Sequence, residues 1–226
     1  MENKFSHQDI LIVGDSFCNE RSDLDTWPTK LVELLTGDSR RARGAGFSGC
    51  HWWSVKRCLD LELAKLTPKI LVVCHTEVSR VPSDLNYPFN YATVHLSEEK
   101  FLPHQVGPDW RLYLEAARYY YKYLQSNLWD EWTANAWYKE LDSVIEENKI
   151  PCVIHLFCFP QSNLYNFKNG LTSIERLSEL SKVHPGTLNH FSKQANISIA
   201  TAIADMITDH YEDGVVKDFN LLKLCK

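Results

Sequence analysis

The chain has 226 residues, of which 44% are hydrophobic and 12% aromatic, so it can bury a sizeable core, unlike a disordered chain. Its formal net charge is −5 and it has no long basic run, which argues against a protein dedicated to binding nucleic acid. It has no apolar stretch that could span a bilayer, no signal-peptide pattern at the N-terminus and no CxxC pair among its seven cysteines. We therefore expect one cytoplasmic domain, residues 1–226, with reduced cysteines.

Continuous apolar runs recur along the chain and are bounded by turn signals. They are residues 10–13 (ILIV), 69–74 (KILVVC) and 151–159 (PCVIHLFCF). Continuous rather than alternating runs are typical of strands that are covered on both faces. Helical patterns lie between them, at residues 26–35 and 51–66. Strand and helix in alternation predict an α/β fold with a parallel sheet and helices on both faces.

Residues 80–148 interrupt this alternation, and we interpret them as an irregular and helical insertion within the domain. The first part is rich in proline and shows little periodicity. Residues 109–149 then follow a strongly helical pattern, which predicts two helices or one bent helix. Near the end of the chain, apolar residues at 197, 199, 203, 206 and 207 predict a final amphipathic helix.

Tryptophan and tyrosine are concentrated between residues 110 and 138. Helices that cover a sheet use large side chains for packing, and rings that stack on sugars are the alternative interpretation. Tyr119, Tyr120 and Tyr121 are consecutive, so they cannot all face one core. We expect core packing with a partly exposed rim, and at least one of the three tyrosines exposed.

The turn after the first apolar run holds the first candidate for chemistry. Gly14, Asp15 and Ser16 follow this strand directly, and ligands of a parallel sheet bind beyond the carboxyl ends of its strands. A serine there acts as a nucleophile if a base takes its proton and N–H donors hold the oxyanion. The alternative is that Ser16 only caps the helix that follows.

Three blocks of the sequence resemble those of the SGNH, or GDSL-type, hydrolases. The first is GDSF, which contains Ser16. The second is RGAGFSGCHWWSVK, in which Gly49 matches the glycine whose N–H is an oxyanion donor in the family. The third is TLNHFSKQANISIATAIA, in which His190 matches the family's histidine before the last helix. The resemblance runs from the first strand to the last helix and is weakest over residues 80–150.

His184 is the alternative histidine, because the VHPG sequence around it resembles the His-Pro of the family. It lies six residues too early relative to Ile199 and Ala200, which match the apolar-alanine pair of the family. The spacing therefore favours His190.

The resemblance implies a three-layer α/β/α sandwich with a parallel central sheet, SGNH- or flavodoxin-like. It also implies a carboxylic ester hydrolase that needs no metal or organic cofactor. Ser16 would attack the carbonyl, His190 would take its proton, and the N–H groups of Ser16 and Gly49 would hold the oxyanion. An acetyl or acyl group on a glycan is one candidate substrate, and Trp52 and Trp53 are candidates for lining its cleft. We expect no nucleic-acid or membrane partner.

The first departure from the family pattern follows the second strand. The family reads Gly-x-Asn-Asp there and uses the Asn side chain as an oxyanion donor, whereas this chain reads HTEV at residues 75–78. An ionised carboxylate only accepts hydrogen bonds. Three alternatives remain: a protonated Glu77 donates to the oxyanion, His75 or Thr76 supplies the donor, or the donor is absent.

The second departure is Thr187, which stands where the family has an Asp three residues before the histidine. That Asp orients the imidazole and stabilises its charged form. We expect the second nitrogen of His190 to meet a neutral acceptor, either the Thr187 hydroxyl or a backbone carbonyl. The departures keep a second hypothesis open, an SGNH-like binding or structural protein without catalysis. Their combination also resembles SGNH-like proteins of bacteriophages.

A zinc site is a further alternative, because HTE at 75–77 and PCVIH at 151–155 loosely resemble the zinc deaminase pattern. Both motifs open helices in that pattern, whereas residues 151–159 are predicted to form a strand. Side chains three apart on a strand point to opposite faces. We therefore predict no metal site.

Overall fold

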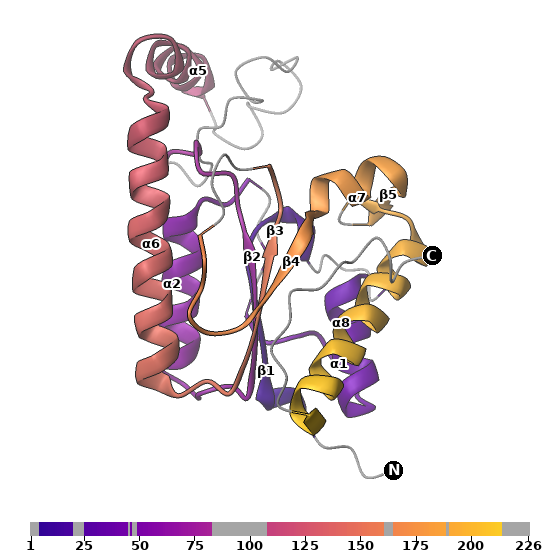
Figure 1. Cartoon of the computed structure of the whole chain (residues 1–226). Coiled ribbons are helices and arrows are strands. Elements are labelled where there is room, and N and C mark those ends of the chain that lie inside the picture. The colour runs from indigo at the N-terminus through magenta and orange to yellow at the C-terminus, as the bar shows by residue number, and fades with distance from the viewer. Residues whose placement is uncertain are drawn as a thin grey trace.

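The computed structural model is a mixed α/β fold with one parallel four-stranded sheet, in the strand order β1-β2-β3-β4 (Figure 1). It describes residues 5–19, 25–44, 46, 49–82, 108–160, 165–188 and 190–213. The strands of the sheet are β1 (Ile10–Val13), β2 (Ile70–His75), β3 (Cys152–Phe157) and β4 (Leu171–Arg176). The predicted α/β class and parallel sheet are confirmed.

The first three strands are made of apolar residues except for His75 and His155, they contain no Lys, Arg, Asp or Glu, and every residue in them is buried. Their parallel register pairs Ile10 with Ile70, and Ile70 with Cys152. The predicted runs at 69–74 and 151–159 match β2 and β3 within one or two residues at each end. The sequence analysis did not identify β4, which contains Glu175 and Arg176 and so lacks a continuous apolar run.

Helices cover both faces of the sheet (Figure 1). The α-helices of the described residues are α1 (Trp27–Thr36), α2 (Trp52–Leu63), α5 (Trp110–Tyr119), α6 (Asn127–Asn148), α7 (Leu177–Val183) and α8 (Lys193–Asp213). On one face, α1, α7 and α8 share a hydrophobic core with Ile12 and Val72. On the other, α2 and α6 share a core with Leu11 and Leu71. Successive strand residues therefore enter different cores, as the pleat of a strand requires.

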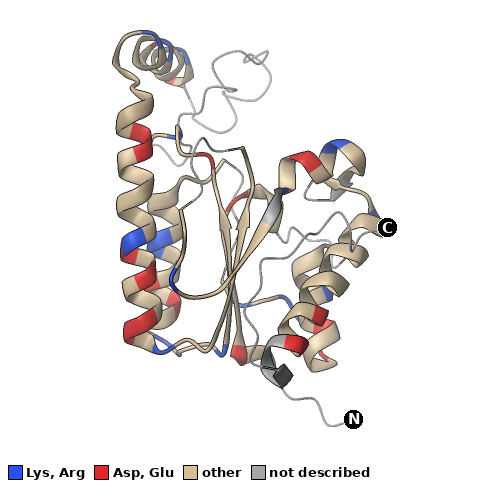
Figure 2. Ribbon diagram, viewed as in Figure 1, with Lys and Arg blue, Asp and Glu red and all other residues tan. Residues whose placement is uncertain are grey.

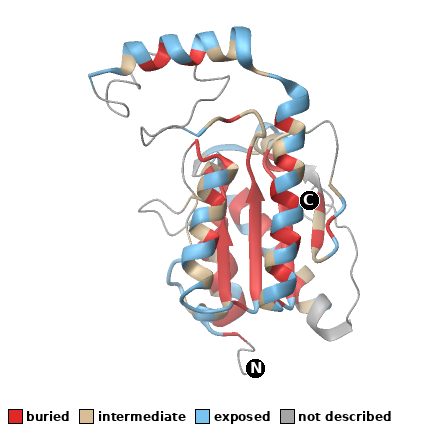
Figure 3. Cartoon of the chain, turned by 90° about the vertical axis from the view of Figure 1, so that its left-hand side faces the viewer, coloured by how far each residue is buried: buried red, intermediate tan, exposed pale blue. Residues whose placement is uncertain are grey.

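The helical pattern at 109–149 is two helices, α5 and α6, joined by a π-helical segment, η3 (Tyr120–Leu124). Figure 3 shows α5 projecting beyond the sheet, with much of its surface exposed. Trp137 and Tyr138, lower on α6, are buried. Exposed aromatic residues occupy the junction, namely Tyr119, Tyr123, Trp129 and Trp132. Tyr119 is 55% exposed, which confirms that at least one of the three consecutive tyrosines lies at the surface.

Lys, Arg, Asp and Glu residues occur on the helices, the loops and β4, whereas β1, β2 and β3 contain none (Figure 2). The six cysteines within the described residues are free thiols. Of the helices that the structure describes, none combines the length and the apolar content that crossing a membrane requires.

Candidate active site

Ser16 begins a one-turn 3₁₀ helix directly after β1, at the carboxyl end of the sheet. Asp15 caps this turn, because its Oδ1 accepts a hydrogen bond from Phe17 N at 3.0 Å. Gly14 lets the chain pass close to β2, since a Cβ atom there would lie 2.4 Å from the Cβ of Cys74. The alternative role of Ser16 as a helix cap is therefore wrong, because the residue before it fills that role.

Ser16 and His190 are within hydrogen-bonding distance, with Ser16 Oγ 2.9 Å from His190 Nε2. The turn that carries His190 follows β5 (Pro185–Leu188) and is closed by the pairing of Pro185 with Phe191. The φ angle of His190 is +76°, a left-handed conformation that few residues other than glycine adopt. Ser16 is half-buried and His190 exposed, so a ligand can reach both. The predicted proximity is confirmed, and the catalytic role stays a prediction.

Phe17 supports the imidazole of His190, with the two ring centroids 4.5 Å apart. The Phe17 ring also contacts Phe159 and Phe191, at centroid distances of 5.6 and 5.7 Å. Its backbone carbonyl accepts a hydrogen bond of 2.7 Å from Trp27 Nε1. Sequence reasoning missed Phe17, although its place next to Ser16 was the signal that could have found it.

Asp15 is a fully buried carboxylate beside Ser16 in the chain. Its Oδ2 lies 3.3 Å from Arg80 Nη1, and its Oδ1 accepts a hydrogen bond of 3.1 Å from the Cys158 thiol. Burial raises the pKa of Asp15, while the Arg80 charge and the N–H of Phe17 act in the opposite direction. Arg80 is therefore the main neighbour that favours the ionised form of Asp15 against the effect of burial.

Arg80 joins the loops at the carboxyl ends of the strands, and its side chain is only 6% exposed. Its Nη1 donates to the Cys50 carbonyl at 2.8 Å and to Thr76 Oγ1 at 2.7 Å. The guanidinium also lies 4.9 Å from the centre of the Phe159 ring. Sequence reasoning did not place Arg80 in the site, because a single arginine in a loop has no motif of its own.

Glu77 is paired with Arg80, with 3.5 Å between Oε2 and Nε, and it accepts a 3.0 Å hydrogen bond from Ser79 Oγ. Both carboxylate oxygens therefore contact groups of their own loop, one a guanidinium and the other a hydroxyl. The hypothesis that a protonated Glu77 donates to the oxyanion is therefore wrong, because this side chain contacts Arg80 and Ser79 of its own loop instead.

His75 contacts His155, with His75 Nε2 3.0 Å from His155 Nδ1, while His155 Nε2 lies 3.0 Å from the carbonyl of Asn169. Because a carbonyl only accepts, His155 carries its proton on Nε2 and accepts from His75. The Thr76 hydroxyl donates to the Cys50 carbonyl at 2.7 Å. The hypothesis that His75 or Thr76 replaces the missing donor is therefore wrong, because both hydrogen atoms have other acceptors.

The two histidines of the zinc alternative meet as stacked rings, with centroids 5.2 Å apart and planes 16° apart. Burial lowers the pKa of His155 to about 4, and that of His75 falls well below its usual value for the same reason. Cys152 lies in the core on the opposite face of the sheet. Within the described residues, no group of three or more His, Cys, Asp and Glu side chains could hold a metal ion.

Gly49 has a φ of +73° and directly precedes Cys50, whose carbonyl Arg80 and Thr76 hold. This contact brings the second sequence block to the same edge of the sheet as Asp15. The Thr187 side chain lies outside the described residues, so the expected neutral acceptor for His190 stays a prediction.

Trp52 and Trp53 are the first residues of α2. Trp52 lines a small cavity together with Trp137 and Tyr138 of α6, whereas Trp53 is 45% exposed. Trp52 therefore packs toward the helical layer, and Trp53 is open to solvent. Their predicted role in lining a substrate cleft stays a prediction.

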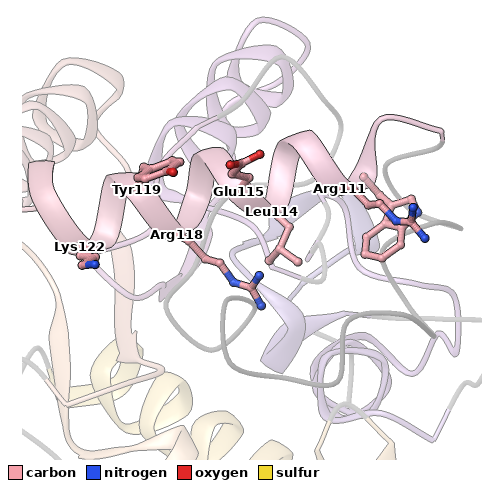
Figure 4. A pocket seen from close by; sticks show the side chains of 7 residues that line it. Arg111, Leu114, Glu115, Arg118, Tyr119 and Lys122 are labelled. Atoms are coloured by element: carbon pink, nitrogen blue, oxygen red, sulfur yellow. The ribbon is translucent and has the colours of Figure 1, made fainter.

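A cavity of about 690 Å³ lies along α5 (Figure 4). Its lining includes Trp110, Arg111, Glu115, Arg118, Tyr119 and Lys122. In Figure 4 the Arg118 and Leu114 side chains extend from the same side of the helix. Next to this helix, Tyr121 of η3 donates a 3.0 Å hydrogen bond to the carbonyl of Ser79, which connects η3 to the loop carrying Arg80.

The resemblance to the SGNH hydrolases stands on the three sequence blocks. No family model, curated protein or solved structure matches the chain. The geometry around Ser16 is therefore the ground on which a function can be proposed.

Proposed function

We propose that the protein is a serine esterase of SGNH type, which hydrolyses a carboxylic ester. The observation that carries the proposal is the 2.9 Å contact between Ser16 Oγ and His190 Nε2. A serine hydroxyl becomes a nucleophile when a base lies at this distance. The place of Ser16 at the carboxyl end of a parallel sheet supports the proposal, as do helices on both faces, which fit a three-layer sandwich.

The reaction has two stages. Ser16 Oγ attacks the ester carbonyl while His190 Nε2 takes the hydroxyl proton, and the N–H groups of Ser16 and Gly49 hold the oxyanion. The intermediate then collapses, and His190 gives the proton to the departing alcohol. In the second stage, His190 takes a proton from water, which attacks the acyl-Ser16 ester. Collapse of this intermediate releases the carboxylic acid, and His190 returns the proton to Ser16 Oγ.

Two features of the site act on His190 in place of the Asp that the family has at the position of Thr187. The Phe17 ring packs against the imidazole and restricts its orientation. Burial has the largest effect on the pKa of Asp15 and raises it. The positive charge of a protonated His190 is among the effects that lower this pKa. The attraction is mutual, so the Asp15 carboxylate favours the imidazolium that forms during the reaction.

A second candidate function is an SGNH-like scaffold that binds a ligand without catalysis. The ion pair between Glu77 and Arg80 favours it, because Glu77 stands where the family has a neutral Asn donor. The loss of one oxyanion donor typically lowers turnover by about two to three orders of magnitude. The two candidates therefore differ in whether any turnover depends on Ser16.

Hydrolysis of p-nitrophenyl acetate and of longer p-nitrophenyl esters tests the proposal. The wild type should hydrolyse at least one of them, and Ser16→Ala and His190→Gln should reduce the rate to that of the uncatalysed reaction. Ser143→Ala, an exposed serine of α6, is the matched control and should leave the rate unchanged. Hydrolysis that is equal in the wild type and Ser16→Ala would support the non-catalytic scaffold.

A further inference from the structure

The backbone carbonyl of Cys50 accepts two side-chain hydrogen bonds, from Thr76 Oγ1 at 2.7 Å and from Arg80 Nη1 at 2.8 Å. A carbonyl oxygen has two lone pairs, so both are in use. The next residue, His51, caps α2 through its Nδ1, which accepts a 3.1 Å hydrogen bond from Trp53 N. Cys50 and His51, the two residues that follow Gly49, are therefore both held in place by hydrogen bonds.

The guanidinium of Arg80 is itself fixed from several directions. Asp15 Oδ2 lies 3.3 Å from Nη1, Glu77 Oε2 lies 3.5 Å from Nε, and the Phe159 ring lies against the group. A planar guanidinium held by two carboxylates and a ring has one orientation. Arg80 thus connects Asp15, the residue before Ser16, with the carbonyl of Cys50, the residue after Gly49.

We propose that Arg80 is a positioning residue, which sets the Gly49 N–H against Ser16 by holding the Cys50 carbonyl and the Asp15 carboxylate. This inference rests on the proposed function, and it assigns a role to a residue outside the three SGNH-like blocks. Gly49 has a φ of +73°, and a loop in this conformation keeps its N–H in one direction only if its neighbours are fixed. Arg80 acts through these neighbours and not on the reacting atoms.

The inference explains how the site can work without an Asn donor after β2. The family places a donor side chain in that loop, whereas this chain uses Thr76 and Arg80 of the same loop to hold another backbone segment. A remaining donor acts on the oxyanion only if it is held within a fraction of an ångström of its productive position. Rigid placement of Gly49 is thus the contribution that we assign to Arg80.

The test compares four variants of the full chain with the wild type. Arg80→Lys keeps the charge but loses the planar group that lies beside Glu77 and against the Phe159 ring. Thr76→Val removes the hydroxyl donor to Cys50, and Thr76→Ser keeps it. Arg57→Lys, an exposed arginine of α2, is the matched control. Three quantities are measured: the rate of Ser16 labelling by a fluorophosphonate, amide hydrogen exchange over residues 49–51, and the thermal unfolding midpoint.

Arg80→Lys and Thr76→Val should each label at least about tenfold more slowly than the wild type, because misplacement of a catalytic group costs this much or more. Amide exchange over residues 49–51 should be faster in both variants. Thr76→Ser should keep the labelling rate and the exchange rate of the wild type. With a p-nitrophenyl ester, kcat should fall while KM stays within about twofold. If Arg80→Lys fails to fold, the two Thr76 variants decide the question.

Two results separate this inference from the proposed function. Labelling of Arg80→Lys or Thr76→Val at the wild-type rate would overturn the positioning role of Arg80 but would not affect the esterase proposal. A wild type that does not label at Ser16 would overturn the esterase proposal. Amide hydrogen exchange then still tests the positioning role of Arg80. Unchanged exchange over residues 49–51 in both variants would overturn that role as well.

Discussion

Asp15 and Arg80 form a buried ion pair, with Asp15 Oδ2 3.3 Å from Arg80 Nη1 and side chains that are 0% and 6% exposed. Asp15 immediately precedes Ser16, whose hydroxyl contacts His190. Burial raises the pKa of Asp15, and the Arg80 charge opposes this effect because water does not screen the pair. The pair therefore links the stability of the fold to the geometry of the candidate site.

The first prediction concerns this pair. Asp15→Asn and Arg80→Gln should each lower the free energy of unfolding by about 3 kcal/mol or more, because each leaves its partner's charge buried. The double variant should lose less than the sum, because it leaves neither charge behind, and the coupling should lie between about 0.5 and 3 kcal/mol. Urea unfolding followed by circular dichroism measures all four proteins. Strictly additive losses would show that the two charges do not interact.

The second prediction concerns the ring that supports His190. Phe17→Leu keeps an apolar side chain but removes the flat surface that lies 4.5 Å from the imidazole. We expect a loss of about 1 kcal/mol in stability and a clear fall in the rate of fluorophosphonate labelling. The control is Phe167→Leu, a buried ring in the core on the α6 side of the sheet. Equal labelling rates for the two variants would contradict a role for Phe17 in orienting His190.

The third prediction is a pH dependence of stability that arises from His155. Its pKa is about 4 in the folded protein, because of burial, against an ordinary value of 6.5. Between these values the unfolded chain binds more protons, so the contribution of His155 to stability falls as the pH is lowered from 6.5 to 4. The loss amounts to about 3 kcal/mol at most.

Thermal unfolding of His155→Gln across this pH range should show a shallower dependence than the wild type. An amide can still donate to the Asn169 carbonyl but does not titrate. His184→Gln, a half-buried histidine, is the control for the substitution itself and should keep the wild-type slope. A slope in His155→Gln as steep as in the wild type would rule out this origin.

The fourth prediction concerns two tryptophans of the same helix, α6. Trp137 is 3% exposed, whereas Trp132 is 61% exposed and stacks only on Trp129 among the described rings. Trp137→Ala should lower the free energy of unfolding by about 3 to 5 kcal/mol, and Trp132→Ala by less than about 0.5 kcal/mol. Urea unfolding of both variants measures the difference. Equal losses would mean that the exposed end of α6 is covered in solution.

The elements that could be predicted are those whose evidence is local. The strands β1, β2 and β3 are apolar except for His75 and His155, because a strand covered on both faces has no side that faces water. The strand β4 and helix α7 were not identified, since Glu175 and Arg176 lie at the point where one ends and the next begins.

The residues of the candidate site show the same difference between local and long-range evidence. The pair of Ser16 and His190 was found because both residues lie in short blocks with fixed spacing. The role of Arg80 was not found, because it depends on contacts with Asp15 and Cys50 that are 65 and 30 positions away. The interpretation of Glu77 failed for a related reason. Its motif position suggested a donor, but the direction of its side chain depends on an ion pair that a motif does not encode.

The central claim is that Ser16 is a nucleophile activated by His190. The most direct measurement is the covalent labelling of the native protein by a fluorophosphonate, with the modified residue located by peptide mass spectrometry. We expect one adduct on Ser16 of the wild type, none on Ser16→Ala or on heat-denatured protein, and labelling of His190→Gln that is slower by about 10²- to 10⁴-fold. An unlabelled native wild type, or an adduct that forms equally fast in His190→Gln, would contradict the claim.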